Sequence, residues 1–168
     1  MQSLSDGLIR QIKDIEIIPN KPLLITDADE VLLNFVSCFQ EYLKKNNLWY
    51  DLSSYSLFGN IKDHSNNAIE NTQVSFHLEN FFKTNARVIT FAIDSIKYIK
   101  LLIEKLNFQI IVLTNIPYKY LEDRRICFKN NGLDLPMIAG SGPKGKIIKE
   151  LVSNCLLYTS DAADECSG

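Results

Sequence analysis

Two acidic residues directly follow a short apolar run near the start of the chain. Asp27 and Asp29 come after residues 23–26, whose sequence is Leu-Leu-Ile-Thr. Carboxylates at positions i and i+2 can reach one site if the chain turns there. One can then bind a divalent cation and attack an electrophile, while the other donates and later accepts a proton. This pair fits covalent phosphoryl transfer, in which a cation offsets the repulsion between carboxylate and phosphate.

Polar residues also end two later apolar runs. Thr114 and Asn115 follow residues 108–113, and Lys144 follows residues 135–139 in a Gly-rich turn. Thr114 offers a hydroxyl and a backbone N–H to phosphate oxygens, and Lys144 offers a charge that holds phosphate and nucleophile together. Singly, such residues are often helix caps, turn residues or solvated side chains. Their order at successive strand ends favours the functional interpretation.

The elements that position these residues alternate between strand and helix. The apolar pattern predicts strands over residues 23–26, 108–113 and 135–139, and helices over residues 31–45, 94–106, 117–130 and 144–152. We expect residues 23–26 to be a buried strand, and Asp94 or Ser95 to cap the second helix. This alternation predicts a Rossmann-like three-layer α/β/α fold, a doubly wound parallel sheet whose active site lies off the carboxyl ends of the strands.

Residues 46–90 differ in composition from the segments around them, because Asn, Ser and aromatic residues dominate and the apolar period is weak. We expect a small, mainly helical cap insert there, between two parts of one core at residues 21–45 and 91–154. Residues 1–20 are predicted to be an N-terminal helical extension.

Three residues of the predicted helix over residues 117–130 carry further expectations. Arg124 and Arg125 are expected on a solvated helix face, and Cys127 is expected to be a small buried hydrophobe. In the insert, His64 and His77 are expected to be surface or packing residues in preference to a metal pair.

The composition excludes several classes of protein. Hydrophobic residues make up 46% and charged residues 23% of the 168 residues, as in globular domains. No window approaches the roughly 18 apolar residues of a membrane span, and Asp6 and Arg10 interrupt any signal peptide. The net charge of −2 without a basic block argues against nucleic-acid binding, and four widely spaced cysteines fit a reducing cytoplasm better than a zinc site or disulfides.

The C-terminal residues are unlike the rest of the chain. Residues 155–165, CLLYTSDAADE, match one reading frame of a transposase sequencing adapter. We therefore expect residues 155–168 to be an adapter-derived tail, and the chain to be a C-terminally truncated fragment that is poorly stable and inactive by itself.

Taken together, these motifs resemble the haloacid dehalogenase-like (HAD) hydrolase superfamily. Its first motif, an apolar strand followed by Asp-x-Asp, is matched by residues 23–32; its second, a strand ending in Thr or Ser, by residues 110–115; and its third, a Lys at a helix start, by Lys144. The resemblance spans residues 21–152, with the insert where the superfamily places its first cap. The form Asp-x-Asp-x-Val-Leu-x-x-Phe is similar to that of the deoxyribonucleotidase branch.

The resemblance implies a role for each matching residue. Asp27 would be the nucleophile and a magnesium ligand, and Asp29 the acid/base and a magnesium ligand through its backbone carbonyl. Thr114, Asn115 and Lys144 would bind phosphate. The second Asp favours phosphate chemistry over dehalogenation. The implied activity is a magnesium-dependent phosphohydrolase acting on a small phosphorylated metabolite or nucleotide.

The sequence departs from the superfamily pattern at two places. Glu30 stands where Gly or Thr is common and adds a charge near the metal site. The fourth, acidic motif is absent, and Asp161 and Asp164 in the tail are not a substitute for it. Two alternatives stay open: a receiver domain, which is disfavoured because its Asp lies on the third strand, and a catalytically silent binding or scaffold protein on the same fold.

Overall fold

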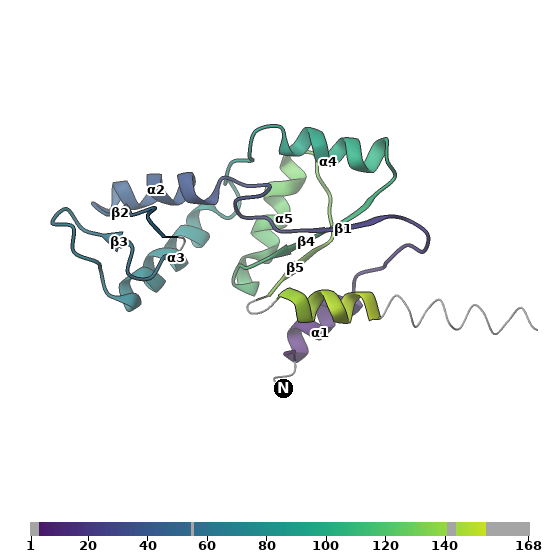
Figure 1. Cartoon of the computed structure of the whole chain (residues 1–168), viewed down its shortest axis with the longest axis horizontal. Helices are drawn as coiled ribbons and strands as arrows, with labels where there is room; N and C mark the ends of the chain where they lie inside the picture. The colour runs from purple at the N-terminus through teal and green to yellow at the C-terminus, as the bar shows by residue number, and fades with distance from the viewer. Residues whose placement is uncertain (1–3, 55, 141–143, 154–168) are drawn as a thin grey trace, which may run out of the picture.

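A three-stranded parallel sheet forms the centre of the computed structural model, which describes residues 4–54, 56–140 and 144–153 (Figure 1). Its strands are β1 (Leu23–Thr26), β4 (Gln109–Thr114) and β5 (Met137–Ala139), in the order β1-β4-β5. The register pairs Thr26 with Val112 and Thr114 with Ala139. The chain is therefore a mixed α/β protein with a parallel sheet, as the alternating pattern predicts.

Strand β4 is the middle strand and is buried along its whole length. Because side chains alternate across a pleated strand, Ile110 and Val112 join one hydrophobic cluster while Ile111 and Leu113 join the other. Strands buried on both faces are apolar throughout, which explains the continuous run Ile-Ile-Val-Leu.

Helices cover both faces of the sheet. On the side of Ile110 lie α4 (Ser95–Glu104) and α5 (Leu121–Asn130), which follows the short 3₁₀ helix η1 (Tyr118–Tyr120). On the side of Ile111 lie α1 (Asp6–Lys13) and the helical residues 144–153. Figure 1 shows α4 and α1 on opposite sides of the sheet. Both helices that connect successive strands lie on one face, as crossovers of one handedness require.

A second group of elements lies beside the sheet, at the left of Figure 1. It consists of α2 (Phe35–Lys45), the antiparallel pair β2 (Trp49–Tyr50) and β3 (Ile61–Lys62), and α3 (Asn71–Asn85). Aromatic rings join the two helices, with the centroids of Phe39 and Phe81 5.2 Å apart. We call this group the helical lobe.

Two backbone segments connect the helical lobe to the sheet and pair with each other. Asn34 N donates to Thr90 O, and Ala92 N donates to Leu32 O, both at 2.9 Å. The two connecting segments therefore form one short antiparallel pair.

Several predicted features differ in the structure. The helix predicted from Val31 begins at Phe35, because a tight loop occupies the preceding residues. Strand β1 is half-buried where a buried strand was predicted, since among the described residues it pairs with β4 alone. Asp94 precedes α4 in the left-handed conformation, and its side chain does not cap the helix.

The tail predicted at residues 155–168 lies outside the described residues. Within the described part of the chain, no helix is both long enough and apolar enough to span a membrane.

Candidate functional site

The predicted site residues gather where the parallel strands end. Thr26, Thr114 and Ala139 are the last residues of their strands, and all three strands point the same way. Asp27 and Asn115 directly follow the first two. The carboxyl edge of a parallel sheet is where open α/β folds bind ligands.

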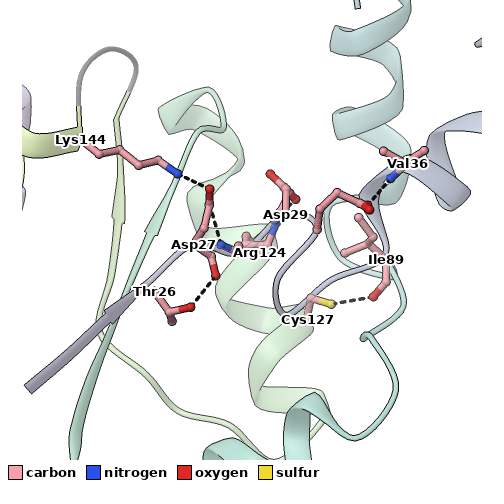
Figure 2. Close-up of polar contacts among 10 residues, drawn as sticks. Thr26, Asp27, Asp29, Val36, Ile89, Arg124, Cys127 and Lys144 are labelled. Carbon is pink, nitrogen blue, oxygen red and sulfur yellow. Dashed lines mark hydrogen bonds and ion pairs between the residues drawn. The ribbon is translucent and has the colours of Figure 1, made fainter. Parts of the chain in front are cut away.

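Asp27 and Lys144 are in direct contact at this edge (Figure 2). The Asp27 Oδ2 atom forms an ion pair with Nζ of Lys144, the first described residue after residues 141–143. The Asp27 Oδ1 atom accepts a hydrogen bond from the backbone N–H of Ala28 at 2.8 Å. Both charged side chains stay about one-third exposed, at 37% for Asp27 and 34% for Lys144. The carboxylate is thus fixed at both oxygens and still open to solvent.

Asp29 has a different partner, Arg124 on α5. Nη1 of Arg124 donates to Oδ1 of Asp29 at 2.7 Å. The Arg124 side chain is 0% exposed and that of Asp29 is 19% exposed. The expectation of a solvated Arg124 is therefore wrong.

The spacing along α5 explains the position of Arg124. The buried residues of this helix are Leu121, Arg124, Cys127 and Phe128, at intervals of three and four residues. Arg124 falls on that inward face, so the helical period signalled its burial although its charge suggested otherwise. Cys127 is buried as predicted, and its Sγ lies 3.3 Å from the carbonyl oxygen of Ile89.

A tight loop fixes the backbone around Asp29. The carbonyl of Ala28 accepts hydrogen bonds from the N–H groups of Leu32 and Leu33, both at 2.9 Å. Glu30 N donates to Leu33 O at 2.9 Å, and Glu30 has a φ of 57°. This left-handed conformation favours residues without a β-carbon, which explains why glycine suits the position.

The Glu30 carboxylate has a structural partner of its own. Its Oε1 atom accepts the backbone N–H of Val36 at 2.6 Å, in the first turn of α2 (Figure 2). The first N–H groups of a helix lack intrahelical partners, and an acidic side chain there is favourable. The Glu30 charge therefore stabilises the start of α2.

The site combines two carboxylates with two cations. The pKa of Asp29 is raised, chiefly because burial disfavours its charged form, and the charge of Asp27 acts in the same direction. The hydrogen bond and charge of Arg124 and the charge of Lys144 oppose this rise in the pKa of Asp29. A raised carboxyl pKa suits a group that must hold a proton near neutral pH.

Thr114 and Asn115 lie at the same edge with different exposure. Thr114 is fully buried, and its Oγ1 has no hydrogen-bond partner among the described residues. Asn115 is exposed and lines a groove of about 800 Å³ together with Arg10, Tyr118 and Gly140. The structure thus brings Asp27, Asp29 and Lys144 into one charged cluster. The other two predicted residues, Thr114 and Asn115, lie at the same edge of the sheet but outside this cluster.

The donor atoms available to a metal are oxygens. Among the described residues, no group of three His, Cys, Asp or Glu side chains could hold a metal ion. Mg²⁺ accepts a smaller protein contribution, because it keeps several waters and binds through one or two carboxylates plus substrate phosphate. The Asp27 carboxylate and the Asp29 backbone carbonyl are of the right chemical kind. Comparison with protein-family models, with curated proteins and with solved structures finds no match to this chain.

Proposed function

We propose that the protein is a magnesium-dependent phosphohydrolase that cleaves a small phosphate ester, a phosphorylated metabolite or nucleotide. The observation that carries the proposal is the contact between Asp27 and Lys144, with Asp29 two residues further on. Asp27 and Lys144 place a carboxylate and a cation together, open to solvent. The second carboxyl group beside them has a raised pKa. These groups together suit phosphoryl transfer.

In the first step, an Asp27 carboxylate oxygen attacks the phosphorus. A bond forms between that oxygen and phosphorus, and the bond from phosphorus to the leaving oxygen breaks. Asp29, in its protonated form, gives its proton to the leaving oxygen. The product alcohol departs and Asp27 carries the phosphoryl group.

In the second step, water attacks the phosphorus of the aspartyl-phosphate. The Asp29 carboxylate, now without its proton, takes a proton from that water. The bond between phosphorus and the Asp27 oxygen breaks, which releases inorganic phosphate and restores both carboxyl groups.

The remaining residues bind and orient the phosphate and the metal ion. Lys144 offsets negative charge on Asp27 and on the phosphate oxygens, and the exposed Asn115 side chain would contact those oxygens. The Thr114 hydroxyl lies buried beneath this edge, so it makes no contact with the phosphate in this mechanism. The Asp27 carboxylate and the Asp29 backbone carbonyl would hold Mg²⁺, which offsets charge between carboxylate and phosphate when it is bound.

The test is phosphate release from p-nitrophenyl phosphate, with Mg²⁺ and after chelation. It is made on the 168-residue chain and on an extended protein, in which the gene segment expected after Asn154 replaces the adapter-derived tail expected at residues 155–168. We expect magnesium-dependent turnover by the extended protein and none by the 168-residue chain. Phosphate binding by the extended protein without turnover would favour the silent binding protein instead.

A further inference from the structure

Arg124 is the buried charge that the mechanism above does not use. It has five N–H donors, and among the described residues only the bond from Nη1 to Asp29 Oδ1 satisfies one of its side-chain nitrogens. Its Nε and Nη2 atoms are buried and have no hydrogen-bond partner among those residues. Buried polar groups are normally paired, so the burial of an arginine with two unpaired nitrogens needs an explanation.

Fold stability alone is a weak reason for this pair. Removing two charges from water costs more than a partly satisfied ion pair returns, and apolar residues of similar volume often replace such pairs without loss. The neighbours of Arg124 on the inward face of α5, Leu121, Cys127 and Phe128, are all of a kind that would accept an apolar side chain. The contact with Asp29 therefore indicates that Arg124 serves the chemistry of Asp29.

The chemistry of the two groups restricts where the Asp29 proton can lie. A guanidinium donates hydrogen bonds and accepts none, so it binds best to the carbonyl oxygen of a protonated carboxyl group, which is a better acceptor than the hydroxyl oxygen. Because Nη1 donates to Oδ1, the contact favours a proton of Asp29 on Oδ2. The loop from Ala28 to Leu33 fixes the backbone of Asp29, and Arg124 fixes its side chain.

We propose that Arg124 is a positioning residue, which holds the Asp29 carboxyl group so that Oδ2 presents the proton to the leaving oxygen. This inference rests on the proposed phosphohydrolase function and deepens it. Arg124 touches neither the phosphate nor the leaving group in this account and acts only through Asp29.

The test compares two substrates of similar shape that differ in their need for a proton. The phenolate of p-nitrophenyl phosphate leaves readily without protonation, whereas that of phenyl phosphate needs a proton. In Arg124→Met of the extended protein, we expect the rate constant of the first step, measured by release of the phenol in a single turnover, to fall by about 10²-fold for phenyl phosphate, the range of lost general acid catalysis. For p-nitrophenyl phosphate we expect the same rate constant to fall by less than about fivefold, while the later hydrolysis step, which needs the Asp29 base, slows equally for both substrates.

Arg125→Met is the matched control, because Arg125 is the neighbouring residue on α5 and contacts Met137 O and Glu122 instead of Asp29. We expect it to leave the ratio of the two first-step rate constants unchanged. Arg124→Lys keeps the cation but lacks the planar fork and its reach, so it should change the ratio in the same direction and less strongly.

The outcomes separate the inference from the function on which it rests. Equal loss of the first-step rate constant on both substrates in folded Arg124→Met would overturn the positioning role and leave the phosphohydrolase intact. If Arg124→Met does not fold by circular dichroism, Arg124→Lys decides, and an unchanged ratio there overturns the role. No turnover of either substrate by the unsubstituted extended protein would overturn the function and the inference together.

Discussion

Asp27 and Lys144 are separated by 117 residues in the chain, and their side chains meet where β1 ends and the helical residues 144–153 begin. The sheet brings them together, because β1 and β5 are parallel strands on either side of β4. The contact joins the first and third motifs of the sequence at one point.

The first prediction concerns Asp27. In the extended protein, Asp27→Asn should abolish phosphatase activity, since an amide cannot form the aspartyl-phosphate. The free energy of unfolding should change by less than about 1 kcal/mol, because the pair with Lys144 is partly exposed. Asp123→Asn is the matched control: it removes the 2.5 Å ion pair with Arg87 and should keep full activity. Activity of Asp27→Asn within about tenfold of the unsubstituted protein, a barrier difference near 1.4 kcal/mol, would contradict the covalent mechanism.

A double-mutant cycle tests the coupling between Asp29 and Arg124. Arg124→Met leaves a carboxylate without its partner, and Asp29→Asn leaves a fully buried guanidinium without a counter-charge. We expect each single variant to destabilise the extended protein, by about 3–5 kcal/mol for Asp29→Asn and by less for Arg124→Met, because Asp29 is partly exposed and can take up a proton. The double variant should be less destabilised than the sum of the two, because neither charge is stranded. Urea unfolding measures all four proteins, and additive losses would mean that the two residues are not energetically coupled.

Glu30 combines a favourable hydrogen bond with an unfavourable backbone conformation. Glu30→Ala removes the acceptor for Val36 N–H and keeps a β-carbon at a φ of 57°, so it should destabilise by about 1 kcal/mol. Glu30→Gly loses the same bond but relieves the left-handed strain, which is worth about 1 kcal/mol, and should be more stable than Glu30→Ala. Thermal melting of the unsubstituted protein and the two variants gives their order of stability. An alanine variant as stable as the unsubstituted chain would show that the Val36 contact contributes nothing.

His77 makes the helical lobe sensitive to pH. Burial lowers the pKa of His77, whose Nδ1 lies 3.3 Å from the hydroxyl oxygen of Tyr42. The unfolded chain therefore binds the His77 proton more readily than the folded chain, and stability falls as pH drops below the unfolded pKa of about 6.5. We expect the melting temperature to fall between pH 7 and pH 5, and to fall less in His77→Gln. Parallel curves for the two proteins would contradict this assignment.

Much of the sheet could be predicted because its signals are local. The apolar run at residues 23–26 coincides with β1, and the run at residues 108–113 differs from β4 by one residue at each end. Gly132, just past the end of α5, is another local signal, because glycine is the usual residue at this position of a helix end. It has a φ of 75°, and its N–H donates to Lys129 O while Leu133 N donates to Phe128 O, the hydrogen bonds of a Schellman motif.

Other features depend on contacts that local patterns do not show. The predicted insert contains α3, a helix of 15 residues, whose inward residues Val74, Leu78, Phe81 and Phe82 are spaced as in a helix and were hidden among polar neighbours. The start of α2 at Phe35 depends on the loop from Ala28 to Leu33, which is held by long-range pairing with Phe91. The partner of Asp29 was missed because an arginine suggested a solvated face.

The most direct test of the central claim is to trap the phosphoryl group on Asp27. The Asp29→Asn variant of the extended protein should accumulate the intermediate from p-nitrophenyl phosphate, because formation needs no proton with this leaving group and hydrolysis needs the Asp29 base. Acid quenching, reduction with borohydride and mass spectrometry of the peptides then locate the phosphorylated residue. The account predicts homoserine at position 27, formed only when substrate is present and absent when Asp27→Asn is added. Phosphate release with an unmodified Asp27, or with the modification on another residue, would contradict it.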